Sequence, residues 1–129
     1  MTAELSEQAK ALLDGPTYVT LTTIAKDGSP HSTLMWAERE GDVIVFSTVV
    51  GRAKELHLRH NDKVGVSFFD PQNPFAAVSV RGTAAVTREG GPELIQKLAQ
   101  KYTGGPYTYD DGTDNVRVVV RVTPGRVFG

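Results

Sequence analysis

Residues 43–54 read Val-Ile-Val-Phe-Ser-Thr-Val-Val-Gly-Arg-Ala-Lys, and this stretch carries an apolar strand directly into the start of a helix. The uninterrupted apolar run Val43–Phe46 is typical of a buried strand. Two hydroxyls, a glycine and two cations follow, and an amphipathic pattern begins after them. We therefore expect a short helix over Arg52–His60, entered from a strand of the core.

The junction between that strand and that helix brings together groups that bind anions. Ser47 and Thr48 supply hydroxyls at the end of the strand. Arg52 supplies a guanidinium and Lys54 an ammonium, next to the backbone N–H groups at the positive end of the helix. Cations in a first helical turn oppose the macrodipole unless an anion lies there. The pattern predicts a phosphate site; the alternative interpretation is that both cations are merely solvated.

The size and charge of the chain limit the classes of function. The 129 residues suffice for one domain, 1–129, and are too few for two. The formal net charge of −1 gives no global electrostatic case for a nucleic-acid or membrane partner. The absence of cysteine excludes disulfides and thiolate chemistry and suits a cytoplasmic protein. No segment is as apolar and long as a signal peptide or membrane span requires, so we expect neither.

The remaining pattern predicts a mainly β fold with few helices. Thr2 can cap a first helix that ends at Gly15-Pro16, and Pro92–Tyr102 has the spacing of a second sizeable helix. Six strands are expected: Tyr18–Ala25, His31–Glu38, Val43–Ser47, Lys63–Phe69, Phe75–Thr87 and Val116–Val122. The first three form a plausible antiparallel meander, and Gly82 indicates a bulge or bend in the fifth. The last alternates, with its even-numbered valines facing the core. Together they predict a small antiparallel barrel.

Several short motifs follow one another in a characteristic order. They are Asp27-Gly-Ser-Pro30, Trp36, Gly51-Arg-Ala-Lys54, Leu56–Lys63, Val80–Ala84 and the terminal Val116–Pro124. Their order and spacing resemble the flavin-binding split-barrel family, the pyridoxamine 5′-phosphate oxidase-like proteins. Within that family the chain is most similar to the small deazaflavin-dependent oxidoreductases that use coenzyme F420. The resemblance covers about Tyr18 to Val127.

The resemblance implies a six-stranded antiparallel split β-barrel that forms a homodimer with two cofactor sites at the interface. The second strand would line the cofactor ring largely through its backbone, and the family's phosphate positions match the junction described above. Phe75 and Ala77 match positions near the ring or the tail, and Tyr107 and Tyr109 are candidates for a loop that closes the partner's pocket. The implied cofactor-binding residues are therefore Ser32, Thr33, Leu34, Met35, Ser47, Thr48, Arg52, Lys54, Phe75 and Ala77.

The activity implied by the resemblance is hydride transfer between coenzyme F420 and a conjugated organic acceptor, such as a quinone or a tetrapyrrole. The cofactor carries that chemistry, so no catalytic acid or base is required, and none is assigned. His31, His57 and His60 are too scattered for a proton relay, and no metal site is expected. Two alternatives stay open: an oxidoreductase that binds FMN on the same scaffold, and a cofactor-binding protein without turnover. FMN also ends in a phosphate, so the cationic cluster does not distinguish it from F420.

Overall fold

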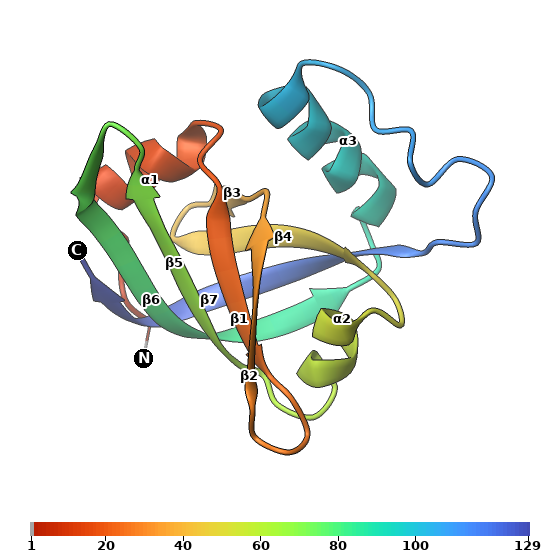
Figure 1. The fold of residues 1–129 in the computed structure, drawn as a ribbon, viewed down its shortest axis with the longest axis horizontal. Helices are drawn as coiled ribbons and strands as arrows, with labels where there is room; N and C mark the ends of the chain where they lie inside the picture. Colours follow the sequence, from red (N-terminus) through yellow and green to blue (C-terminus); the bar gives the residue numbers. More distant parts are fainter. Residues whose placement is uncertain (1) are drawn as a thin grey trace.

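Residues 2–129 are described by a computed structural model, which contains seven strands and three helices (Figure 1). The helices are α1 (Glu7–Asp14), α2 (Ala53–Leu58) and α3 (Gly91–Thr103). The strands are β1 (Val19–Ile24), β2 (Pro30–Met35), β3 (Glu38–Glu40), β4 (Val43–Val49), β5 (Lys63–Asp70), β6 (Asn73–Thr87) and β7 (Arg117–Phe128). All strand pairs are antiparallel and form one sheet in the order β2-β1-β5-β6-β7-β4-β3. The fold is a split β-barrel, which confirms the predicted class with one strand more than expected.

The extra strand arises because the segment expected as one strand over His31–Glu38 changes its partner midway. Its first part, β2, pairs with β1 at one end of the sheet, and β3 pairs with β4 at the other end. Only Trp36 and Ala37 separate β2 from β3, and the side chain of Ala37 is fully buried. This short link holds the two ends of the sheet near each other. The expected meander is therefore right for the first two strands, since β1 and β2 pair antiparallel, and wrong for the third, since β4 pairs with β3 and β7 instead of β2.

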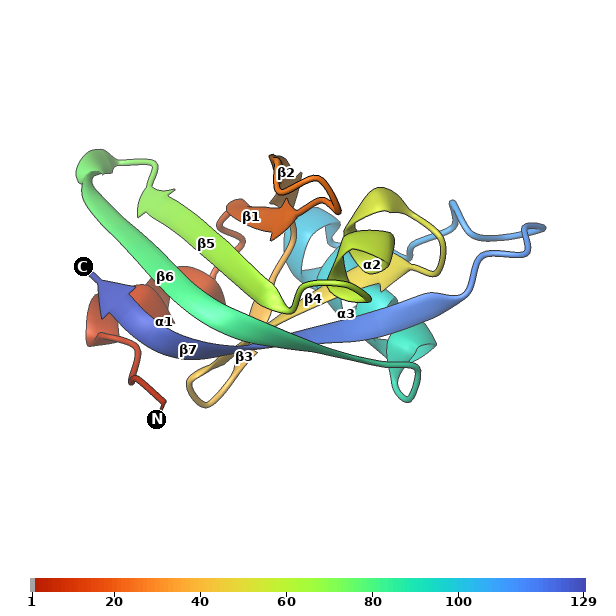
Figure 2. The same ribbon diagram turned by 90° about the horizontal axis from the view of Figure 1, so that it is seen from below.

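The two longest strands, β6 and β7, run side by side along most of the molecule (Figure 2). Their register shifts between Arg81 and Gly82, as the glycine in the sequence predicted. A Cβ atom at residue 82 would lie 2.5 Å from the carbonyl oxygen of Thr123. Glycine is required there because the two backbones approach too closely for any side chain.

The strand β4 is buried on both faces, because the barrel interior covers one and α3 covers the other. Phe46 faces the barrel interior and is fully buried. Val45 faces the opposite way and packs with residues of α3 and with Val119 of β7. The expected alternation of β7 is thus incomplete: Val120 lies in the interior, while Val119 is equally buried beneath the helix.

The helices are fixed to the barrel by polar contacts as well as by packing. The N-cap of α1 is Ser6, whose Oγ accepts a hydrogen bond from the Ala9 N–H, so the expectation that Thr2 caps this helix is wrong. At the end of α3, the Lys101 ammonium donates to the carbonyl oxygens of Leu13 and Ala37. None of the helices described between residues 2 and 129 is long and apolar enough to cross a membrane.

Candidate functional site

Two depressions lie next to each other on the surface and share Tyr18 and Leu34. The smaller, of about 310 Å³, is here called the cationic pocket; its other lining residues include Met35, Trp36, Ser47, Thr48, Arg52, Lys54, Tyr107 and Arg117. The larger, of about 710 Å³, is here called the apolar groove; its other lining residues include Thr20, Phe68, Phe69, Ala77, Val78 and Phe128.

The cationic pocket forms where β4 ends and the chain turns into α2. Ser47 and Thr48 are the last buried polar residues of the strand, with 6% and 3% of their surface exposed. Gly51 adopts a φ of +90°, which only glycine adopts readily, and it turns the chain so that Arg52 becomes the N-cap residue of α2. The junction predicted from the sequence therefore forms, and it places hydroxyls and cations on one wall.

One backbone N–H group at this junction, that of Gly51, already has a partner within the protein. The N–H of Gly51 donates to the carboxylate of Glu55 at 2.8 Å, and Glu55 is buried. Arg59 also binds this carboxylate, and the hydrogen bond it donates is the largest cause that lowers the pKa of Glu55. The protein's own carboxylate thus occupies the N–H group before a helix of only six residues. The N–H group of Gly51 is therefore not available to an anion in the pocket.

Those side chains carry positive charge without a matching acid. Among residues 2–129, neither Arg52 nor Lys54 has a carboxylate within ion-pairing distance, to judge from the seven ion pairs found there. Burial lowers the pKa of Lys54, and the neighbouring charges of Arg52 and Arg117 lower it further. A partly buried ammonium near two other cations is stabilised by a bound anion. The residues of the pocket therefore fit a phosphate group.

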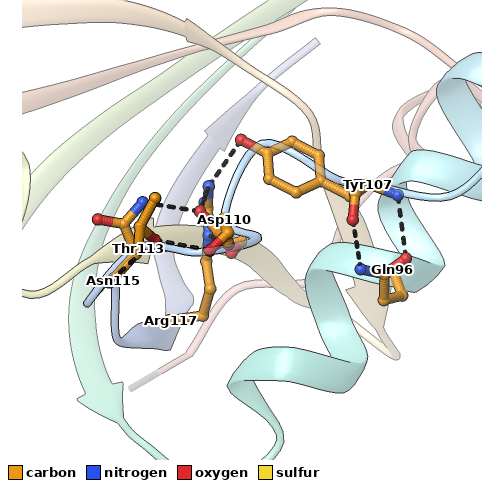
Figure 3. A network of polar contacts seen from close by, with 7 residues as sticks. Gln96, Tyr107, Asp110, Thr113, Asn115 and Arg117 are labelled. Carbon is orange, nitrogen blue, oxygen red and sulfur yellow. Dashed lines mark hydrogen bonds and ion pairs between the residues drawn. The ribbon is translucent and has the colours of Figure 1, made fainter.

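A third cation, Arg117, also lines the pocket, and the sequence did not reveal it. Its guanidinium donates to Asp110 at 2.7 Å and to the hydroxyl of Tyr107 at 2.7 Å (Figure 3). It also donates to Ser47 Oγ at 3.4 Å. Arg117 reaches Ser47 because β7 pairs with β4, where Val49 lies opposite Arg117. The only signal in the sequence was an arginine beside a run of valines, which does not reveal the pairing of two distant strands.

Aromatic side chains form the remaining wall of the cationic pocket. Trp36 stacks on Tyr102 with ring centroids 5.4 Å apart and an interplanar angle of 13°, and Tyr107 contacts it edge-on at 6.2 Å. Tyr107 lies against the pocket of its own chain, whereas the resemblance suggested a role in the partner's pocket. Tyr109 is 82% exposed.

The ten residues implied by the resemblance fall into three groups. Six of them line the cationic pocket: Leu34, Met35, Ser47, Thr48, Arg52 and Lys54. Ala77 lines the apolar groove instead, and Phe75 is 97% exposed at the start of β6. The last two lie on β2 outside both depressions: the Ser32 hydroxyl pairs with that of Thr22, and Thr33 Oγ1 is buried without a hydrogen-bond partner.

The strand β2 also offers its backbone to a ligand. Within residues 2–129 it pairs only with β1, as the end strand of the sheet. An end strand presents unpaired N–H and C=O groups along its outer edge. Leu34 and Met35 lie on this strand and line the cationic pocket, so donors and acceptors run beside the cations.

Comparison with known proteins gives a consistent picture. The profile of the pyridoxamine 5′-phosphate oxidase family matches residues 5–129. A solved structure described as an F420 reductase is 30% identical, with a TM-score of 0.85, and the alignment covers 96% of this chain and 98% of that one. A conserved hypothetical protein from Mycobacterium tuberculosis is 27% identical, with a TM-score of 0.74, over 98% of this chain and 84% of that one.

Curated relatives match over a shorter stretch. A pyridoxine/pyridoxamine 5′-phosphate oxidase from Vibrio vulnificus is 35% identical over 82 residues, which is 62% of this chain and 38% of that protein. The chain therefore spans well under half the length of the curated relatives it matches. The match of the family profile to nearly the whole chain shows that this protein belongs to the pyridoxamine 5′-phosphate oxidase family.

Proposed function

We propose that this protein is an oxidoreductase that uses coenzyme F420 and reduces a conjugated organic acceptor, such as a quinone or a tetrapyrrole. The observation that carries the proposal is the pair of unpaired cations, Arg52 and Lys54, beside an aromatic wall and a free strand edge. The similarity to an F420 reductase over nearly the full length of both chains supports the choice of cofactor.

In this proposal each part of the site binds one part of the cofactor. Arg52 and Lys54 bind the phosphate, and the hydroxyls of Ser47 and Thr48 complete its hydrogen bonds. The backbone edge of β2 binds the polar rim of the ring system, which offers both donors and acceptors. Trp36 and its aromatic neighbours exclude water from the ring. The bound deazaflavin supplies the hydride chemistry, and the protein supplies position and shielding.

The proposal includes a homodimer in which a second copy covers the apolar groove. Leu34 is 67% exposed and Phe69 is 50% exposed, although both are large and apolar. An apolar groove of about 710 Å³ on the surface is costly to leave in water. The cationic pocket, at about 310 Å³, is near the small end of ligand pockets, which span about 300–1,000 Å³. A partner that extends its walls would make room for a whole cofactor.

FMN is the second candidate cofactor, because the curated relatives are named pyridoxine/pyridoxamine 5′-phosphate oxidases. Titrating the purified protein with each cofactor separates the two candidates. We expect the fluorescence of F420 to be quenched or shifted at micromolar concentrations, with little response from FMN. If the protein bound FMN more tightly than F420, FMN would be the proposed cofactor instead.

Removal of the two cations tests the site itself. In the double variant Arg52→Ala/Lys54→Ala, each lost contact should cost about 1.5–3 kcal/mol of binding free energy. The affinity for F420 should thus fall roughly a hundredfold or more. The control is Lys26→Ala, which removes an exposed cation outside the pocket. An affinity of the double variant equal to that of the control would show that the phosphate binds elsewhere.

Turnover distinguishes an enzyme from a protein that only carries the cofactor. We expect the protein to oxidise reduced F420 in the presence of at least one member of a panel of quinones and tetrapyrroles. The double variant should show no such rate at cofactor concentrations that saturate the native protein. Tight cofactor binding with no oxidation against the whole panel would favour the carrier.

A further inference from the structure

We propose that Arg117 is a third cation that binds the ligand's phosphate, and that Asp110 is an internal anion which competes with the ligand for Arg117. The inference rests on the proposed anion site and adds to it a residue and a gating contact. Binding would then move Arg117 from a carboxylate of its own chain to the phosphate of the cofactor.

The position of Arg117 supports the first half of the proposal. Only 8% of its surface is exposed, yet it lines the cationic pocket together with Arg52 and Lys54. Its Nη1 lies 3.4 Å from Ser47 Oγ, a hydroxyl of the same pocket. A guanidinium directed into a pocket with two further cations is suited to a phosphate, because its fork of donors binds two oxygens at once.

The carboxylate of Asp110 now takes the place that such an anion would take. Arg117 donates to both of its oxygens, from Nε at 2.7 Å and from Nη2 at 3.3 Å. These hydrogen bonds are the largest cause that lowers the pKa of Asp110, and the charge of Arg52 lowers it as well. Asp110 is therefore an anion held at the rim of the pocket by its cations.

The segment that carries Asp110 is built so that this contact can be exchanged. Asp110 lies in the irregular stretch between α3 and β7, which includes Gly104, Gly105 and Gly112. One end is fastened to α3, where Gln96 exchanges two hydrogen bonds with the backbone of Tyr107. Near the other end, Asn115 donates to Asp110 at 2.8 Å. Loss of the Arg117 contact would release the turn that contains Asp110 and Asn115 from the Arg117 side chain, while Tyr107 stays attached to α3.

A phosphate and a carboxylate both accept charge-assisted hydrogen bonds from a guanidinium. Arg117 therefore keeps an anionic partner when a phosphate replaces Asp110. The phosphate has the advantage of Lys54, which also lines the pocket, whereas the charge of Arg52 favours Asp110 as well. Tyr107 now accepts a hydrogen bond from the same guanidinium, and its ring lies 4.9 Å from the guanidinium carbon. Tyr107 can thus stay over Arg117 after Asp110 has left and cover the bound phosphate.

Calorimetric titration with inorganic pyrophosphate, followed by titration with F420, tests the competition. In Asp110→Asn, Arg117 no longer has to leave a carboxylate, so both ligands should bind about fivefold more tightly. Asn115→Ala loosens Asp110 without changing any charge, and a smaller gain is expected. Arg117→Lys keeps the charge but loses the fork, and a roughly tenfold loss is expected. The matched control is Asp111→Asn, which removes an exposed neighbouring charge.

Chymotrypsin provides a second readout, because Tyr109 lies in the segment that should be released. Pyrophosphate should speed cleavage there in the native protein, and Asp110→Asn should be cleaved fast without it. Equal affinities of Asp110→Asn and Asp111→Asn, or no gain in Asn115→Ala, would overturn the competition. If Arg52→Ala/Lys54→Ala still bound F420 normally, the proposed function would fail. If that variant lost binding while Asp110→Asn was unchanged, only the present inference would fail.

Discussion

The cationic pocket and the apolar groove lie side by side on one barrel, but they are completed in different ways. In the pocket, acids and hydroxyls of the same chain already hold several of the polar groups, as Asp110 holds Arg117 and Glu55 holds Gly51. In the groove, Phe69 and Leu34 remain half or more exposed with nothing to cover them. The difference indicates that the polar groups of the pocket are organised within one chain, whereas the apolar surface of the groove lacks a cover within that chain and fits the proposed dimer.

The largest expected effect is a loss of stability on substituting Gly91, which packs against the backbone of Arg117, a residue of the cationic pocket. A Cβ atom at Gly91, the first residue of α3, would overlap the carbonyl oxygen of Arg117. Gly91→Ala should therefore push α3 away from β7 and lower the free energy of unfolding by about 3 kcal/mol, measured by urea denaturation. Gly105→Ala, with open space around its Cβ, should leave stability within about 1 kcal/mol of the native value. If the two variants were equally stable, α3 would be able to move away from the Arg117 carbonyl at little cost in free energy.

The next effect breaks the groove and should spare the pocket. Phe69→Glu places a charge where the proposal buries an apolar surface, at a cost of about 2 kcal/mol or more per site. Because a homodimer carries the substitution at two sites, sedimentation velocity should show the dimer dissociating at protein concentrations roughly a thousandfold higher than for the native protein. Pyrophosphate should still bind, because Phe69 does not line the cationic pocket.

The control for the groove is Val86→Glu, which charges an exposed apolar position of β6 outside both depressions. It should leave the dimer intact. If the native protein sedimented as a stable monomer at micromolar concentration, the proposal that a second copy covers the apolar groove would be wrong.

A smaller effect concerns the pH dependence of the pocket. Burial and then the charges of Arg52 and Arg117 lower the pKa of Lys54 in the folded protein. Between that lowered pKa and the ordinary lysine value, the unfolded chain binds more protons, so the stability of the ligand-free protein should rise with pH. Pyrophosphate affinity should fall over the same window, because Lys54 loses its charge. In Lys54→Arg the charge persists, and calorimetry at several pH values should show a flatter profile.

The smallest effect concerns the one buried side-chain oxygen without a partner among residues 2–129, Thr33 Oγ1. Replacing an unsatisfied hydroxyl with a methyl group removes the cost of its desolvation. Thr33→Val should therefore raise the free energy of unfolding by up to about 1 kcal/mol, measured by thermal denaturation. A loss of cofactor affinity without a loss of stability would instead assign this hydroxyl to the ring of the ligand.

Features that depend on neighbouring residues could be predicted from the sequence. The junction between β4 and α2 consists of eight consecutive residues, and its hydroxyls and cations line the same pocket in the structure. The bend at Gly82 follows from the lack of a side chain in a long strand. These predictions required no knowledge of which strands pair.

Features that depend on pairing or on a competing side chain could not be predicted. Arg117 enters the pocket because β7 lies beside β4, a contact between residues about seventy positions apart. The exchange of partners at Ala37 depends on how the two ends of the sheet meet. Glu55 takes the backbone N–H of the junction, although its position in the sequence equally suits a solvated first-turn acid.

Trp36 is the only tryptophan of the 129 residues, and it stacks on Tyr102 in the wall of the cationic pocket. The intrinsic emission of the protein at tryptophan wavelengths therefore originates from a single ring at the proposed binding site. Any event that alters the packing or wetting of that ring is visible without a label or an added dye. The intrinsic fluorescence of Trp36 can therefore report ligand binding directly in a screen.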